Sequence, residues 1–172
     1  MTRRRPSLVA AACVAGLLVL IAGCDKDKKG VEPPAELVDL KPTLAVQKLW
    51  DTGVGGGGEK LRLALGLALD RGVLFTAARD GEVVALDPAT GRVKWSQDTK
   101  ADLAAGPGVG ASIVAVGTSD GKVIALDVAS GKVLWKVSVS SEVLAAPLVT
   151  GDRVIVRSVD GRVHALDALT GK

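Results

Sequence analysis

The sequence contains few of the residues on which catalytic and metal sites most often depend. Its 172 residues include one histidine, two cysteines and no tyrosine, and aromatic residues make up 2%. No His, Cys, Asp or Glu residues have the spacing of a metal site, and no serine or cysteine has a credible base partner. The glycines at 55–58 lack the Lys-Ser/Thr pair of a phosphate-binding loop. The sequence therefore predicts no catalytic residue, no metal ligand and no cofactor.

An excess of positive charge is also missing outside the extreme N-terminus. The chain has 22 Lys and Arg residues against 19 Asp and Glu residues. Three of the basic residues are Arg3, Arg4 and Arg5, and without them the remaining 19 positive charges equal the 19 negative ones. A neutral protein has no electrostatic attraction for a phosphate backbone, so nucleic acid is excluded as a partner.

Residues 1–23 have the parts of a secretory signal peptide. The arginines precede an apolar run at residues 8–22, which is shorter than the roughly 20 residues of a bilayer-spanning helix. A short transmembrane helix is the alternative. The motif Ile21-Ala22-Gly23-Cys24 resembles a bacterial lipobox, which implies cleavage between Gly23 and Cys24 and acylation of Cys24. Cys13 would be removed with the peptide, so no disulfide is expected.

The next segment, residues 24–43, is predicted to be the lipidated cysteine and a flexible tether. It is rich in charge, contains Pro33-Pro34 and lacks hydrophobic periodicity. Several acyl chains on Cys24 would hold the protein far more firmly than one chain. We expect it on the periplasmic face of the outer membrane. Asp25 keeps the inner membrane as an alternative location, because aspartate at this position retains some lipoproteins there.

A period of 40 residues runs through the rest of the chain. Asp-Gly pairs begin at 80, 120 and 160, and Ala-Leu-Asp triplets begin at 85, 125 and 165. Such a period indicates stacked or radial units, and each unit here contains short apolar strands joined by tight turns. The sequence predicts an all-β fold, a β-propeller of four-stranded blades that forms an incomplete ring. Residues 44–172 would hold an orphan strand (44–54), two blades (61–100 and 101–140) and a truncated third (141–172).

The pattern Ala-Leu-Asp-x-x-Thr/Ser-Gly-x-x-x-Trp resembles the repeat of pyrroloquinoline-quinone-type propellers. In these folds the tryptophan of the outer strand docks on a turn of the neighbouring blade. The resemblance implies a structural docking role for Trp50, Trp95, Trp135, Asp87, Asp127, Asp167, Gly91, Gly131 and Gly171. His164 aligns with Val84 and Ile124 in the third strand of the repeat, which favours a packing role over catalysis.

The layout of signal peptide, lipidated cysteine, tether, orphan strand and propeller resembles the BamB family of outer-membrane assembly lipoproteins. The resemblance implies a non-enzymatic periplasmic scaffold whose partners are BamA, other subunits of the assembly machinery and nascent outer-membrane proteins. The chain ends where a further strand with a tryptophan near position 175 is expected, which indicates an N-terminal fragment. Two alternatives remain open, a quinoprotein dehydrogenase that uses pyrroloquinoline quinone and a propeller lipoprotein with an unrelated binding role.

Overall fold

The computed structural model describes residues 34–39, 41–57, 63 and 65–172. The predicted signal peptide, Gly23 and Cys24 lie outside the described residues. The chain divides into two units, residues 1–45 and residues 46–172. The described part of the first unit contains no helix and no strand. No helix in the described ranges is long and apolar enough to cross a membrane.

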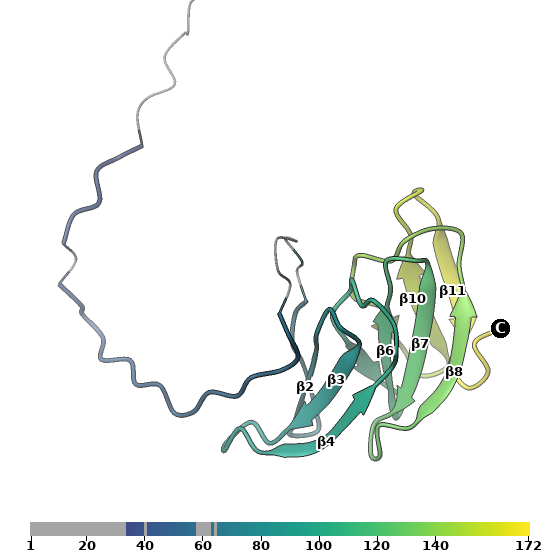
Figure 1. The fold of residues 1–172 in the computed structure, drawn as a ribbon, viewed down its shortest axis with the longest axis horizontal. Helices are drawn as coiled ribbons and strands as arrows, with labels where there is room; N and C mark the ends of the chain where they lie inside the picture. Colours follow the sequence, from purple (N-terminus) through teal and green to yellow (C-terminus); the bar gives the residue numbers. More distant parts are fainter. Residues whose placement is uncertain (1–33, 40, 58–62, 64) are drawn as a thin grey trace, which may run out of the picture. The chain divides into compact units, whose positions relative to one another are not determined.

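The second unit consists of antiparallel sheets that follow one another along the chain (Figure 1). The first sheet contains β1 (Ala68–Asp70), β2 (Val73–Ala77), β3 (Glu82–Leu86) and β4 (Val93–Asp98). The second contains β5 (Gly108–Gly110), β6 (Ile113–Gly117), β7 (Lys122–Asp127) and β8 (Val133–Ser138). The third contains β9 (Leu148–Val149), β10 (Arg153–Arg157) and β11 (Val163–Asp167). The predicted all-β fold of four-stranded propeller blades in an open ring is confirmed.

Each Asp-Gly pair forms the tight turn that joins the second strand of a sheet to the third. Gly81 has φ 102° and Gly121 has φ 75°, values that a glycine adopts without steric cost. The turn between β2 and β3 sets the register that places Thr76 opposite Val84 and Phe75 opposite Ala85. The turn between β6 and β7 does the same 40 residues later, so the sheets repeat strand by strand.

The core lies between neighbouring sheets, because the side chains of the inner strands alternate between the two faces. Val83 on β3 packs in one apolar cluster with Ile124 and Leu126 on β7. Val123 on β7 packs in a second cluster with Val154 on β10. The inner strands β6 and β7 of the second sheet are thus buried on both faces, as their nearly continuous apolar sequence predicts. Full burial of one such side chain stabilises the fold by about 1.5–3 kcal/mol.

The predicted orphan strand at residues 44–54 is not a strand in the structure. The segment contains no strand, and no named strand among the described residues pairs with it. A strand is defined by hydrogen bonds to a neighbour, and among the described residues no strand lies beside this segment to supply them. Its tryptophan is nevertheless placed like those of the outer strands β4 and β8, as shown below.

Candidate functional site

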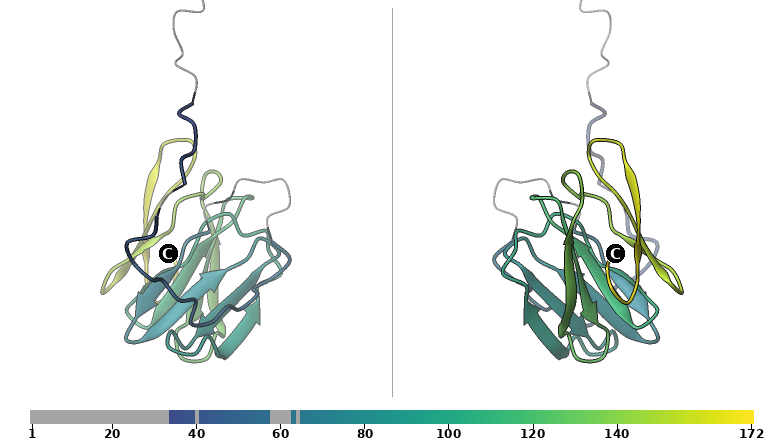
Figure 2. Two further views of the ribbon diagram at one scale, coloured as in Figure 1. Left: turned by 90° about the vertical axis from the view of Figure 1, so that its left-hand side faces the viewer. Right: turned by 90° about the vertical axis from the view of Figure 1, so that its right-hand side faces the viewer.

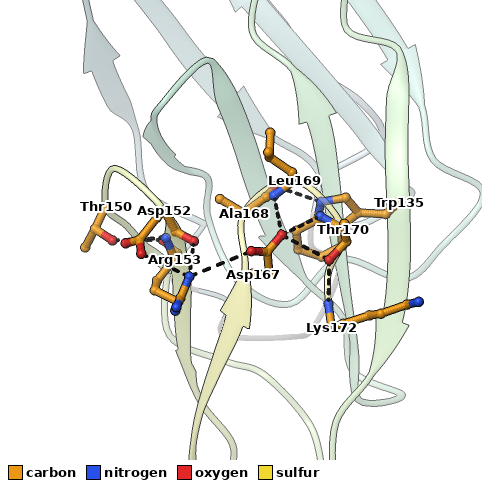
Figure 3. A network of polar contacts seen from close by, with 9 residues as sticks. All are labelled: Trp135, Thr150, Asp152, Arg153, Asp167, Ala168, Leu169, Thr170 and Lys172. Carbon is orange, nitrogen blue, oxygen red and sulfur yellow. Dashed lines mark hydrogen bonds and ion pairs between the residues drawn. The ribbon is translucent and has the colours of Figure 1, made fainter.

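A hydrogen-bonded loop joins the third and fourth strand positions of each sheet, and we call residues 87–91, 127–131 and 167–171 the docking loops. The carboxylate Oδ1 of Asp87 accepts hydrogen bonds from the backbone N–H groups of Ala89 and Thr90, both at 2.9 Å, and from the Thr90 hydroxyl at 3.0 Å. Asp167 does the same with Leu169 and Thr170 (Figure 3). These donors favour the charged form and hold the pKa of both carboxyl groups below its ordinary value.

The second docking loop has the same construction. Ser130 donates to Oδ1 of Asp127 from its backbone N–H at 2.8 Å and from its hydroxyl at 2.6 Å. The Ser130 hydroxyl is the main cause of the lowered pKa of Asp127. The three aspartates therefore shape the loops, which accounts for their recurrence every 40 residues.

A tryptophan from the preceding segment docks on each loop. The indole Nε1–H of Trp50 donates to the carbonyl oxygen of Pro88, that of Trp95 to Val128 and that of Trp135 to Ala168, each at 2.9 Å. Figure 3 shows Trp135 against the third loop. Trp95 also contacts Phe75, with ring centroids 5.9 Å apart. The Phe75 contact lies within the first sheet, and each indole joins one sheet or segment to the next by its hydrogen bond.

The glycine that ends each docking loop lies directly under the indole. A Cβ atom added to Gly91 would be 2.5 Å from Cε3 of Trp50, and the corresponding distances are 2.6 Å for Gly131 with Trp95 and 2.8 Å for Gly171 with Trp135. All three glycines have φ near 70°. A side chain at these positions would therefore strain the backbone and displace the ring. The nine residues that the sequence assigns to docking lie together as three equivalent sites.

The opposite end of each sheet carries charged and hydroxyl side chains around the Asp-Gly turns. The Thr118 hydroxyl donates to Asp120 at 2.5 Å, and the Ser158 hydroxyl donates to Asp160 at 2.5 Å. The hydroxyls of Ser158 and, next in size of effect, Ser140 lower the pKa of Asp160 to about 2. The carboxylates of Asp120 and Asp160 thus accept hydrogen bonds from residues of their own turns.

His164 lies in a polar environment that the sequence did not predict. Its Nε2 atom is 3.1 Å from the Ser140 hydroxyl and 3.2 Å from the Ser158 hydroxyl. Ser158 aligns with Thr118 in the second repeat and with Ala78 in the first. The hydroxyl residue shared by two of the three repeats was the one signal in the sequence for a polar neighbour of His164. In the part of the chain that the structure describes, no carboxylate hydrogen bonds to the imidazole, so the cluster lacks the orienting acid of a catalytic triad.

A pocket lies between the loop that follows β4 and the strands β7 and β8. Three of the residues that line it are lysines: Lys100, Lys122 and Lys136. Each ammonium group already has an oxygen partner, because Lys100 pairs with Asp98, Lys122 pairs with Asp120 and Lys136 donates to the carbonyl oxygen of Thr99. Within the described ranges no group of three or more His, Cys, Asp or Glu residues is arranged to hold a metal ion.

Comparison with known proteins finds a family model that matches most of the chain. The family model described as outer membrane protein assembly factor BamB matches residues 45–104 and 79–172. The protein of that name from Pseudomonas aeruginosa is 40% identical over 87 residues, which cover 51% of this chain and 23% of that protein. The one from Xanthomonas campestris is 41% identical over 81 residues, which cover 47% and 20%. The chain thus spans less than a quarter of the length of these curated relatives.

Solved structures show the same fold. The crystal structure of BamB from Moraxella catarrhalis superposes with a TM-score of 0.57 and 32% identity, over 64% of this chain and 34% of that one. Quinohemoprotein alcohol dehydrogenase ADHIIG from Pseudomonas putida superposes with a TM-score of 0.56 and 28% identity, over 66% of this chain and 20% of that one. The blade architecture is therefore shared by proteins with an assembly role and by enzymes.

Proposed function

Because the chain belongs to the family of outer membrane protein assembly factor BamB, we propose that it is a non-enzymatic scaffold lipoprotein of the β-barrel assembly machinery. In this role it aids the assembly and insertion of outer-membrane β-barrel proteins. The observation that carries the proposal is the family match, which extends over residues 45–172 and includes all three docking sites.

The structure supports a scaffold in two ways. The indole contacts tie successive sheets into one unit, so surfaces on different sheets keep a fixed spacing. The outer strands β4 and β8 lie at the ends of their sheets and expose apolar side chains, among them Val93 and Leu134. An exposed strand edge of this kind accepts an extended polypeptide by strand addition, which suits a nascent barrel protein as a client.

The proposed partners are BamA and other subunits of the machinery, nascent outer-membrane proteins and, through acylated Cys24, the membrane. We place the protein on the periplasmic face of the outer membrane. Asp25, directly after the acylated residue, keeps the inner membrane as the alternative location, and density-gradient fractionation of membranes separates the two.

The experiment for the assembly role is co-purification. The full chain, tagged at its C-terminus, is crosslinked in cells and isolated from detergent-solubilised membranes. We expect BamA in the eluate, and an unrelated tagged lipoprotein of the same membrane serves as the control. Repeated absence of BamA under crosslinking would overturn the proposal.

A quinoprotein dehydrogenase is the second candidate, favoured by the structural similarity to ADHIIG. Its cofactor would be pyrroloquinoline quinone with Ca²⁺, which supplies the oxidising group. The described residues offer no cluster of three or more His, Cys, Asp or Glu residues for a metal ion. A dye-linked oxidation assay with alcohols and glucose, after addition of the quinone and Ca²⁺, tests this candidate. Robust turnover would replace the scaffold proposal.

A further inference from the structure

Two lysines of the second sheet project from the face that packs against the first sheet. Ile124 on β7 lies in the apolar cluster that includes Phe75 and Val83 of the first sheet. Lys136 on β8 pairs directly opposite Ile124, and Lys122 is two residues from Ile124 on the same strand. Because side chains alternate along a strand and opposed residues share a face, these lysines point toward the first sheet. Figures 1 and 2 show the two sheets as neighbours, and both have four strands.

A third lysine reaches the same junction from the loop that follows β4. Lys100 has φ 59°, in the left-handed region that residues other than glycine rarely adopt. The Asp98 carboxylate holds it there, because it accepts hydrogen bonds from the Lys100 backbone N–H at 2.8 Å and from its Nζ at 2.5 Å. Lys136 ties the loop to β8 by donating to the carbonyl oxygen of Thr99 at 2.7 Å. The three lysines line one pocket of about 190 Å³, which we call the lysine pocket.

The ammonium groups of the lysine pocket outnumber the carboxylates that pair with them. Lys100 pairs with Asp98 and Lys122 pairs with Asp120. Lys136 donates to a carbonyl oxygen, which carries no net charge. An ammonium group has three N–H donors, and each of these three groups uses one of them among the described residues. One positive charge and several donors are therefore left for a ligand.

The same junction has a second pocket, in which Lys100 and Lys122 are accompanied by acidic side chains. Three aspartates line this second pocket: Asp80, Asp102 and Asp120. Asp102 pairs with Arg79 at 3.0 Å. In the lysine pocket, by contrast, none of the described lining residues is acidic. The carboxylates of the junction thus lie to one side, and the lysine pocket is the side that attracts an anion.

The size and the remaining lining of the lysine pocket favour a single side chain as the ligand. Pockets for small-molecule ligands and cofactors begin at about 300 Å³, which is larger than the 190 Å³ found here. Ala101, Ile124 and Val137 add apolar surface to the lining, and Ser138 adds a hydroxyl group. A glutamate side chain matches this lining, because its methylene groups can cover apolar surface while its carboxylate accepts charge-assisted hydrogen bonds from ammonium groups.

We propose that the lysine pocket binds an acidic side chain, a glutamate in an exposed segment of a partner protein. Its carboxylate accepts hydrogen bonds from Lys136 and from the neighbouring Lys100 and Lys122, and it supplies the negative charge that Lys136 lacks within the chain. The inference does not rest on the assembly role, because every residue that forms the pocket belongs to the second sheet or to the loop before it.

A peptide titration tests the proposal. A fluorescein-labelled peptide of alternating glutamate and serine is titrated with the full chain in detergent and followed by fluorescence anisotropy. We expect it to bind more tightly than the same peptide with glutamine in place of glutamate. Lys136→Gln should weaken binding about fivefold, the upper value for a solvent-exposed ion pair, and Lys136→Arg should retain it. Thermal melts check that each variant keeps its fold.

Lys132→Gln is the matched control for Lys136→Gln. It removes the same charge from the same sheet, but beside the docking loop at residues 127–131, and Lys132 is not among the residues that line the pocket. We expect it to bind the glutamate peptide as the unaltered chain does. Equal binding of the glutamate and glutamine peptides, or an equal loss of binding in Lys132→Gln and Lys136→Gln, would overturn the proposal.

Carbodiimide coupling locates the bound carboxylate. The reagent activates a carboxylate, and an ammonium group in contact with it then forms an amide bond after losing its protons. Mass spectrometry of the digested product identifies the lysine that carries the peptide. We expect the glutamate peptide on Lys136, Lys100 or Lys122. Coupling spread evenly over lysines outside the pocket, such as Lys94 and Lys132, would show that the peptide binds the surface without a specific site and would refute the inference.

Discussion

Trp135 on β8 donates its indole N–H to the carbonyl oxygen of Ala168, 33 residues further along the chain, at 2.9 Å. The same separation joins Trp95 to Val128. A repeat in the sequence thus becomes a repeat of contacts between sheets, and each contact fixes the position of one sheet relative to the next. The stability of the array should therefore depend on these indoles.

Truncation of Trp95 to alanine should lower the free energy of unfolding by about 3 kcal/mol. This value is at the lower end of the range for truncation of a large aromatic residue, because Trp95 is only partly buried. Trp95→Phe keeps an aromatic ring and loses the hydrogen bond to Val128, so its cost should be about 1 kcal/mol. Urea unfolding at one fixed protein concentration measures both. Equal costs for the two variants would show that the hydrogen bond, and not ring packing, dominates.

Gly131→Ala should destabilise the fold by about 1–2 kcal/mol or more. Its φ of 73° belongs to the left-handed region, and a Cβ atom would lie 2.6 Å from Cε3 of Trp95. Gly151→Ala is the matched control, because a Cβ atom there meets nothing within 4 Å. Thermal melts of the two variants should separate clearly. A melting temperature for Gly131→Ala equal to that of the control would contradict the assigned docking role.

Most of the docking site could be predicted from the sequence because its parts are local and repeated. Asp87 and Thr90 are three residues apart and form their hydrogen bonds within one loop, whatever lies around them. The structure of residues 46–50 could not be predicted in this way, because a strand needs a partner and the segment that ends in Trp50 does not by itself reveal whether one is present. His164 shows the same limit, because its neighbour Ser140 comes from a loop 24 residues away.

Stability should fall in strong acid through Asp160. Its pKa is lowered to about 2 from an ordinary value of 3.8, mainly by the Ser158 hydroxyl. A lowered carboxyl pKa stabilises the fold fully above the ordinary value, and that contribution is lost as the pH falls from about 4 to about 2. Asp160→Asn should therefore lower the melting temperature at pH 6 and flatten its decline below pH 4. Asp39→Asn, which removes the same charge in the segment before the sheets, should leave the decline unchanged.

The two cysteines of the chain allow a controlled test of the predicted lipid anchor. Cys24 follows Gly23 at the lipobox, whereas Cys13 lies inside the apolar run. Acyl chains hold a protein to a bilayer by burying methylene groups, each worth about 0.8 kcal/mol, so their loss should release the chain from the membrane. Cys24→Ser should abolish acylation, measured by mass spectrometry, and prevent cleavage before residue 24. Cys13→Ser should remain acylated and membrane-bound, and if instead Cys24→Ser carried the same lipid mass, the anchor would have to lie elsewhere in the chain.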